Sequence, residues 1–118
     1  MKPLLLLLAG LILTVGCGPA DGPHTAYHAN GKKKEEGAYR NGEKVGKWIY
    51  YWKSGAQKVE GSYRKGEQEG VWTFYNKNGK RIAQGTYKNG KMWDGTFVRY
   101  VFGTTKMMAY ENGKEMKR

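Results

Sequence analysis

The chain has 118 residues, a formal net charge of +11 and one cysteine. This length allows one domain at most, and a single cysteine excludes an internal disulfide. The basic balance favours either an anionic partner or a well-solvated lysine-rich surface.

The first sixteen residues predict a secretory signal peptide. Lys2 supplies one positive charge, an apolar run extends from Leu4 to Val15, and small residues precede Cys17. This order is typical of a signal that is removed from the mature chain. A membrane-spanning helix needs roughly 20 apolar residues to cross a hydrocarbon core about 30 Å thick, so this run is too short. The alternatives are an uncleaved membrane anchor and a plain signal with an incidental cysteine.

The segment LTVGC, residues 13–17, resembles a bacterial lipobox, although Thr14 stands where leucine is usual. The resemblance implies that Cys17 is lipidated and becomes the first mature residue. Acylation would also remove a thiol that is a liability in an oxidising compartment. Each buried acyl methylene contributes about 0.8 kcal/mol to anchoring. Gly18 favours, by the same analogy, the outer membrane of a two-membrane bacterium, so we expect a lipid-anchored protein of the bacterial cell envelope.

Residues 17–26 predict a flexible tether between the lipid and a folded domain over residues 27–118. The segment 18–26 holds small, turn-prone residues and no aromatic residue, a composition typical of a flexible linker. His24 and His28 lie four residues apart, but no third ligand is near them in the sequence. Because zinc normally takes three or four protein ligands, we expect no metal site.

A unit of 24 residues repeats through the rest of the chain. Three columns keep this interval, namely Gly37, Gly61 and Gly85, then Tyr39, Tyr63 and Tyr87, then Gly42, Gly66 and Gly90. Trp48 and Trp72 are also 24 apart, and Phe97 follows one residue late because the segment GKMWDG is longer by one. Half-units at 27–31 and 109–113 flank the array. Such repetition predicts units that pack mainly on their neighbours.

Each unit predicts two short strands and two turns. The segments 46–52 and 70–75 carry aromatic and β-branched residues between glycine-marked turns, which is typical of strands. Asn-Gly pairs favour tight hairpin turns, and they begin at Asn30, Asn41, Asn78, Asn89 and Asn112. Recurrent glycine disfavours helices, at about 1 kcal/mol for each residue. We expect an all-β fold, an elongated single-layer antiparallel meander of stacked β-hairpins with about eight strands.

Aromatic side chains must supply the packing of this sheet. No leucine follows residue 16, whereas all sixteen aromatic residues lie from Tyr27 onward. A glycine leaves room for a ring from the next strand, and each ring pair adds about 0.5–1.5 kcal/mol beyond area burial. Alternation places Trp48, Tyr50 and Trp52 on one face and Tyr51 on the other. The aromatic residues predicted to be structural are Tyr39, Trp48, Tyr51, Tyr63, Trp72, Tyr75, Tyr87, Phe97 and Tyr100.

The unit G-x-Y-x-x-G-x-x-x-G-x-W-x-x-Y resembles the MORN (membrane occupation and recognition nexus) repeat in its bacterial variant, over about Tyr27 to Met116. The resemblance implies a curved single-layer sheet and a phospholipid-binding, scaffolding or dimerising role. Many bacterial homologues carry an antitoxin label. The third unit departs from the pattern, because Arg99 replaces an aromatic residue. Trp93 lies in its lengthened turn, either as an exposed anchor or folded back onto the sheet edge.

The sequence holds no cluster that predicts catalysis or a cofactor. Ser54 and Ser62 are the only serines, and neither lies in a G-x-S-x-G context. No glycine spacing fits a phosphate loop. Acidic residues alternate with lysines, as on a solvated surface. We therefore expect a non-catalytic protein without cofactors, and the export signal argues against a nucleic-acid partner.

Two columns of basic residues are the candidate contact with an anionic surface. Arg40, Arg64 and Lys88 follow the repeat tyrosine, and Lys53 and Lys77 form the second column. Residues on alternate strands lie roughly 10 Å apart, close to the Debye length of about 8 Å, so their fields partly reinforce. The alternative is that these lysines and arginines only solubilise the sheet and protect its edges.

These features predict a lipid-anchored binding or scaffolding module of the envelope. Its partner would be a protein or an anionic component such as lipid headgroups, lipopolysaccharide or a cell-wall polymer. The alternative from another class is an antitoxin or immunity-like protein that neutralises a toxic effector, which a toxin gene next to this one would favour.

Overall fold

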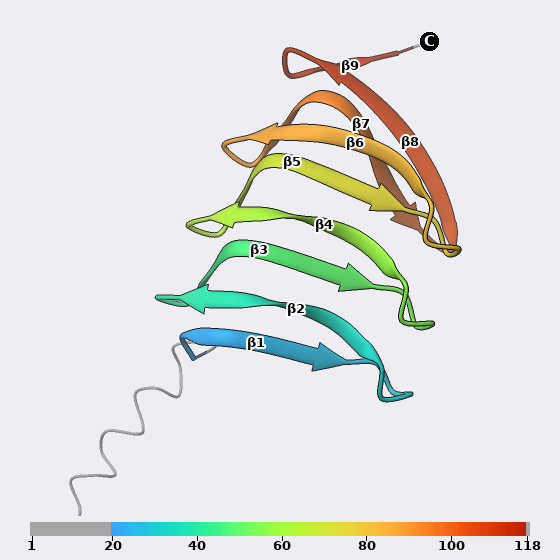
Figure 1. Ribbon diagram of the computed structural model, residues 1–118. Coiled ribbons are helices and arrows are strands. Elements are labelled where there is room, and N and C mark those ends of the chain that lie inside the picture. The colour runs from blue at the N-terminus through green and yellow to red at the C-terminus, as the bar shows by residue number, and fades with distance from the viewer. Residues whose placement is uncertain (1–19, 118) are drawn as a thin grey trace, which may run out of the picture.

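The computed structural model describes residues 20–117, so the predicted signal peptide 1–16 and Cys17 lie outside the described residues. Nine antiparallel strands form one sheet in chain order (Figure 1). The strands are β1 (Gly22–Tyr27), β2 (Lys33–Arg40), β3 (Glu43–Tyr51), β4 (Gln57–Arg64), β5 (Glu67–Tyr75), β6 (Arg81–Lys88), β7 (Lys91–Val101), β8 (Thr104–Glu111) and β9 (Lys114–Met116). This confirms the predicted meander of stacked hairpins, with nine strands for the expected eight or so. Residues 20–117 contain no helix with the length and hydrophobicity that a membrane crossing requires.

The predicted tether is too long, because residues 22–26 belong to β1. This strand pairs with β2 along its length, from Gly22 opposite Tyr39 to Tyr27 opposite Lys33. The ring of His24 adds packing, since it stacks 5.6 Å from Trp48. Pro23 fits because β1 is the edge strand, where a missing N–H removes no ladder bond. The sheet therefore begins at β1, which leaves at most residues 17–21 for the predicted tether; residues 17–19 lie outside the described residues.

The hairpin turns differ between the two long sides of the sheet where the strands end, which are called its edges below. At one edge two-residue turns have positive φ at both positions, as at Asn41 (52°) and Gly42 (78°). Such turns match the twist of the strands they join, and they confirm the expectation for Asn41, Asn89 and Asn112. At the other edge Asn30 and Asn78 lie in longer turns, where the first residue bonds the carbonyl four positions on. There the tight-hairpin prediction is wrong. Side-chain oxygens stabilise these longer turns, since Asn30 accepts a hydrogen bond from the N–H of Lys32 and Asn76 accepts from the N–H groups of Asn78 and Lys80.

A ladder of aromatic rings crosses the strands and supplies the packing, as predicted. Rings from successive strands meet edge to face at centroid distances between 5.1 and 6.0 Å. In chain order the ladder consists of His24, Tyr39, Trp48, Tyr63, Trp72, Tyr87, Phe97 and Tyr110. Trp48 and Phe97 are fully buried. Because the edge-to-face arrangement is the one that ring quadrupoles favour, each repeat stabilises the next.

Glycine makes this ladder possible at three equivalent positions. A Cβ atom at Gly37, Gly61 or Gly85 would lie 2.2, 2.1 or 2.5 Å from the ring above it. The partner strand bulges at the same level, because the register jumps from Glu60 opposite Thr73 to Ser62 opposite Glu69. A bulge bends its strand and increases the local twist. The glycine and the bulge together let the ring lie flat across the neighbouring backbone.

The opposite face of the sheet carries a second, polar set of contacts. The hydroxyl of Tyr51 donates a hydrogen bond to Glu36, and that of Tyr75 donates to Glu60 at 3.3 Å. The hydrogen bond from Tyr51 is the main cause that lowers the pKa of Glu36. Tyr51 therefore lies on the other face from Trp48 and Tyr50, as the alternation predicts.

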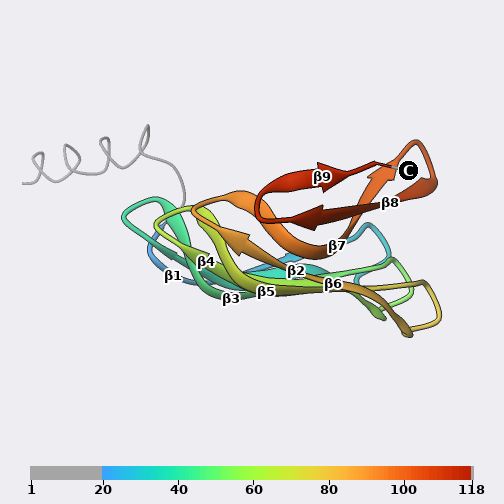
Figure 2. The same cartoon turned by 90° about the horizontal axis from the view of Figure 1, so that it is seen from above.

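The last three strands leave the plane of the sheet and lie over one side of it (Figure 2). Their departure begins at Gly95, where pairing between β6 and β7 ends opposite Gly85. Gly95 has a φ of 105°, and a Cβ there would lie 2.6 Å from Gly85 Cα. Phe97, Val98 and Met108 are thereby buried against the face that carries the ladder. The single layer thus folds back at its end and encloses a small core.

This fold-back places Tyr100 differently from its equivalents in the other repeats. The repeat spacing makes Tyr100 the equivalent of Tyr51 and Tyr75, which bond to glutamates. In the structure its ring instead meets Trp52 of the second unit edge to face, at 5.4 Å. The cause is the departure of β7, which carries Tyr100 across the ladder face. Of the two positions predicted for Trp93, exposed or folded back onto the sheet edge, the structure shows the second, since its ring lies beneath Gly113 of the last turn.

Candidate functional site

The structure separates the predicted basic residues onto opposite edges of the sheet. Arg40, Arg64 and Lys88 are the last residues of β2, β4 and β6, which all end at one edge. Lys53 and Lys77 follow β3 and β5, which end at the other edge. All five side chains are exposed. The two predicted columns therefore cannot form one continuous contact surface.

The edge with the longer turns is basic and free of acidic residues. We call it the lysine edge and define it as the three longer turns 28–34, 52–58 and 76–81 together with the segment 101–106, which contains a two-residue turn at Phe102 and Gly103. All four join strands at the same end of the sheet (Figure 1). No Asp or Glu lies in these four segments. Their basic residues are Lys32, Lys33, Lys34, Lys53, Lys58, Lys77, Lys80, Arg81 and Lys106. All of these except Lys58 are exposed. Within the described part of the chain, only Lys33 among them has an acidic partner, Glu36 at 3.1 Å, so the lysine edge presents a predominantly positive field to solvent.

The opposite edge carries charges of both signs. We call it the mixed edge and define it as the two-residue turns with their flanking residues, 40–44, 64–68, 88–92 and 111–114. Arg40 lies opposite Glu43 in register, and Arg64 lies opposite Glu67. Lys88 lies opposite Lys91 instead, and its ammonium lies 4.6 Å from the centre of the Trp93 ring. Acidic neighbours thus weaken the field of Arg40 and Arg64.

Hydrogen bonds fasten the turns of the lysine edge to one another. Asn30 donates from its side chain to the carbonyl of Lys53 at 2.8 Å. His28 Nε2 lies 3.1 Å from the carbonyl of Tyr51, so this nitrogen must carry the proton, because a carbonyl only accepts. Trp52 Nε1 donates to the carbonyl of Asn76 at 3.1 Å. These bonds join neighbouring units and hold the backbone of the turns in place.

A pocket opens on the lysine edge around Trp52. It has a volume of 460 Å³ and is lined by His28, Tyr51, Trp52, Lys53, Ser54, Lys58 and Lys77. The Lys58 ammonium lies 4.8 Å from the centre of the Trp52 ring and 4.5 Å from that of Tyr100. The Lys77 ammonium lies 5.6 Å from the same indole. Burial, and secondarily the positive charge of Lys77, lower the pKa of Lys58.

From the sequence, no binding role was assigned to four of the lining residues, His28, Trp52, Ser54 and Lys58. None was assigned to Tyr100 either, whose ring lies against Lys58 from an adjoining hollow. Lys58 is the extra residue of a bulge, since Tyr50 pairs with Val59 and Tyr51 with Gln57. The equivalent positions in the neighbouring repeats, 24 residues before and after Lys58, are Lys34 and Ile82. Tyr100 arrives only through the fold-back of β7, and no local pattern in the sequence marks it.

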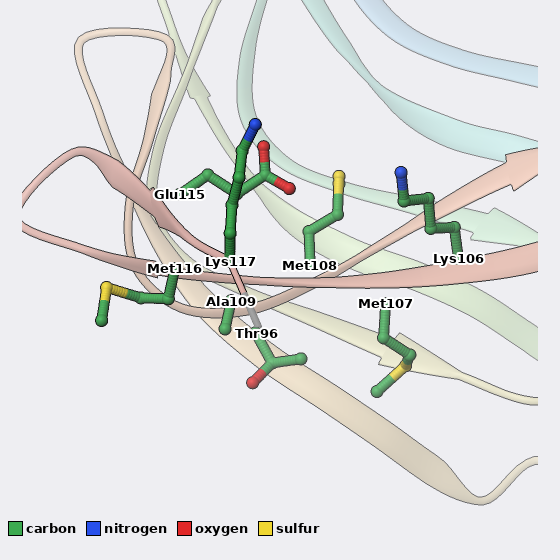
Figure 3. Close-up of a pocket in the computed structure, with 8 residues that line it drawn as sticks. All are labelled: Thr96, Lys106, Met107, Met108, Ala109, Glu115, Met116 and Lys117. Atoms are coloured by element: carbon green, nitrogen blue, oxygen red, sulfur yellow. The ribbon is translucent and has the colours of Figure 1, made fainter.

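A larger hollow of 690 Å³ lies at the C-terminal end. Figure 3 shows Met107 and Met116 on the opposite side of the β8 and β9 ribbons from Met108 and Lys106. Its lining combines thioethers with Glu115 and lysines, so it presents no single charge. Among residues 20–117, no group of three or more His, Cys, Asp or Glu residues is placed to hold a metal ion.

Comparison with known families adds one match. The family model described as MORN repeat variant matches residues 20–41 and 68–89. Each matched segment holds one hairpin with a lysine-edge turn, β1–β2 in the first case and β5–β6 in the second. A search of curated proteins finds no match for this chain. The match indicates a repeat-built binding or scaffolding module, and the matched family is generally non-catalytic.

Proposed function

We propose that this chain is a lipid-anchored binding module of the bacterial envelope that holds an anionic surface against its lysine edge and catalyses no reaction. The observation that carries the proposal is the sign of the charges in the four turns. Basic residues occur there without a single acidic one, whereas residues of both signs occur together in the rest of the repeat domain. Solubility alone would be served equally by mixed charges.

The spacing of the turns strengthens the field of this edge. Equivalent turns are separated by two strands, or roughly 10 Å, and the Debye length is about 8 Å at physiological salt. Fields from neighbouring turns therefore overlap. Close to an anionic membrane each Lys or Arg contributes about 1 kcal/mol, so several turns acting together would give stable binding.

The proposed anchor fits this arrangement, because a lipid on Cys17 would keep the sheet near the membrane surface. Metabolic labelling with a fatty-acid analogue tests it directly. We expect label on the wild-type protein and none on Cys17→Ser. Equal labelling of the two proteins would exclude acylation at this cysteine.

Two variants that remove equal charge test the surface itself. The lysine-edge variant replaces Lys32, Lys53 and Lys80 by Gln, and the mixed-edge variant replaces Arg40, Arg64 and Lys88 by Gln. A soluble fragment of residues 18–118 is sedimented with vesicles of phosphatidylglycerol or phosphatidylcholine. At about 1 kcal/mol for each lost charge, the lysine-edge variant should bind phosphatidylglycerol vesicles at least tenfold more weakly. The mixed-edge variant should lose much less.

Vesicle binding by these two variants also decides which of the two predicted basic columns contacts the membrane. A greater loss in the mixed-edge variant would make Arg40, Arg64 and Lys88 the contact surface and overturn the proposal. Equal binding of all three proteins would mean that the basic residues act only in solubility.

A further inference from the structure

We propose that the pocket around Trp52 binds the acidic group of a saccharide, with Lys58 and Lys77 as its charged contacts. The inference goes beyond surface attraction by the lysine edge, since it assigns a bounded site with a defined ligand class. The edge variants keep Lys58, Lys77 and Trp52 and replace only Lys53 of the pocket lining, so either proposal can fail without the other.

The first observation is a pair of cations gathered on one indole without an acidic partner. Lys58 and Lys77 both point an ammonium at Trp52, at 4.8 and 5.6 Å from its ring centre. No acidic side chain lines the pocket, and none of the ion pairs between described residues includes either lysine. Two nearby ammonium groups repel each other, and an anion placed between them would relieve that repulsion.

The second observation is that the fold builds this site once. Lys34 holds the same repeat position as Lys58 in the first unit, and it is exposed. Ile82 holds that position in the third unit and packs against the core. Only at Lys58 does a ring from a distant strand, Tyr100, close over the lysine. A lysine that served solubility alone would need no such cover.

The third observation concerns the neutral groups around the two cations. An adjoining hollow of 310 Å³ shares Trp52 and Lys77 with the first and adds Asn76, Asn78 and Tyr100. Together the hollows offer aromatic surfaces, amides and the Ser54 hydroxyl. A sugar ring presents an apolar C–H face and hydroxyl groups, which suit aromatic and neutral hydrogen-bonding partners. A ligand pocket commonly has this mixture of apolar walls and a few orienting polar groups.

The charged group of the ligand could be a carboxylate or a phosphate. Lysine binds both a carboxylate and a phosphate as a point charge. The shared chemistry is therefore an anionic group on a sugar ring. Glucuronate and glucose 1-phosphate represent these two sources, and glucose is the neutral control. Acetate and inorganic phosphate test whether the acid alone is sufficient.

Two-dimensional NMR of the full chain in a neutral detergent tests the proposal. The sequence has four tryptophans, so four indole N–H signals are expected, and Trp52→Phe identifies that of Trp52. We expect glucuronate, glucose 1-phosphate or both to shift this signal in a saturable way. Loss of a charged hydrogen-bond donor should weaken binding by at least about tenfold in Lys58→Met. Lys77→Met, at an exposed position where folding is not at stake, should also weaken it severalfold.

The matched control is Lys34→Met, which removes the equivalent lysine of the first unit and should change affinity by less than about twofold. An equal loss in Lys34→Met and Lys58→Met would overturn the proposal, since only net charge would then matter. Equally tight binding of glucose, acetate or inorganic phosphate would also overturn it. So would a Trp52 signal that responds to phosphatidylglycerol vesicles and to none of the sugars.

Discussion

Replacing Gly61 by alanine adds one methyl group directly beneath a ring of the ladder. The new Cβ would lie 2.1 Å from Trp72 Cδ2 and 2.2 Å from Cε2, well inside van der Waals contact. Gly61 has no positive φ, so its backbone accepts alanine. The substitution therefore measures the steric fit between glycine and ring alone.

The ring has little freedom to move away. Trp72 is 2% exposed and lies between Tyr63 at 5.1 Å and Tyr87 at 5.6 Å. Overpacking in a well-packed core costs about 1–3 kcal/mol, and each displaced ring pair adds about 0.5–1.5 kcal/mol. The alanine backbone offsets about 0.5–1 kcal/mol of this cost, because glycine loses more backbone entropy on folding. We expect a net loss of about 2 kcal/mol in the free energy of unfolding.

Urea denaturation of the 18–118 fragment, followed by circular dichroism, measures this loss. Ser62→Ala is the control on the adjacent, exposed residue and should stay within about 0.5 kcal/mol of wild type. In a Trp72→Ala background the clash is gone, so Gly61→Ala should become neutral or slightly stabilising. An equal loss with and without Trp72 would refute the role given to this glycine.

Three further predictions concern the ladder, the opposite face and the fold-back. Trp72 Nε1 is buried without a hydrogen-bond partner, whereas Trp48 Nε1 donates to a backbone carbonyl at 3.1 Å; Trp72→Phe should therefore cost about 1 kcal/mol less than Trp48→Phe in urea denaturation. Burial, and then the hydrogen bond to Glu36, raise the pKa of Tyr51 to about 12, above the unfolded value of about 10. The neutral Tyr51 hydroxyl should therefore stabilise the fold fully below pH 10, and this stabilisation should be lost between pH 10 and 12. Tyr51→Phe should remove that part of the pH dependence in alkaline unfolding curves. Gly95→Ala should release the C-terminal strands, because its Cβ would meet backbone at 2.6 Å and its φ is 105°; faster hydrogen exchange confined to β7–β9 would show this, and unchanged exchange would contradict it.

The ladder could be predicted from the sequence because its information is local and repeated. Gly61 and Trp72 recur at a fixed interval, and alternation along a strand fixes which face each occupies. Neither inference needs contacts between distant strands. The tight turns at Asn41 and Asn89 could be predicted for the same reason.

The remaining features depend on contacts that the spacing alone does not encode. The lengthened turn before Gly95 is visible in the sequence, but the sequence does not show that β7 swings over the ladder and carries Tyr100 to Trp52. The part of β1 before Tyr27 lacks the repeat aromatics and is held by pairing with β2. Lys58 faces the pocket because a bulge shifts the register there. Only part of the lysine edge, Lys53 and Lys77, follows the repeat spacing. Its other basic residues come together with them only because these turns lie at the same end of the strands.

The salt dependence of vesicle binding tests the central claim most directly. The affinity of the 18–118 fragment for phosphatidylglycerol vesicles is measured across a range of salt concentrations for wild type and the two edge variants. Screening weakens interactions between exposed charges, so wild-type affinity should fall steeply with salt. The account predicts a clearly shallower dependence for the lysine-edge variant and a nearly wild-type dependence for the mixed-edge variant. Equal slopes for the two variants, which have the same net charge, would contradict it.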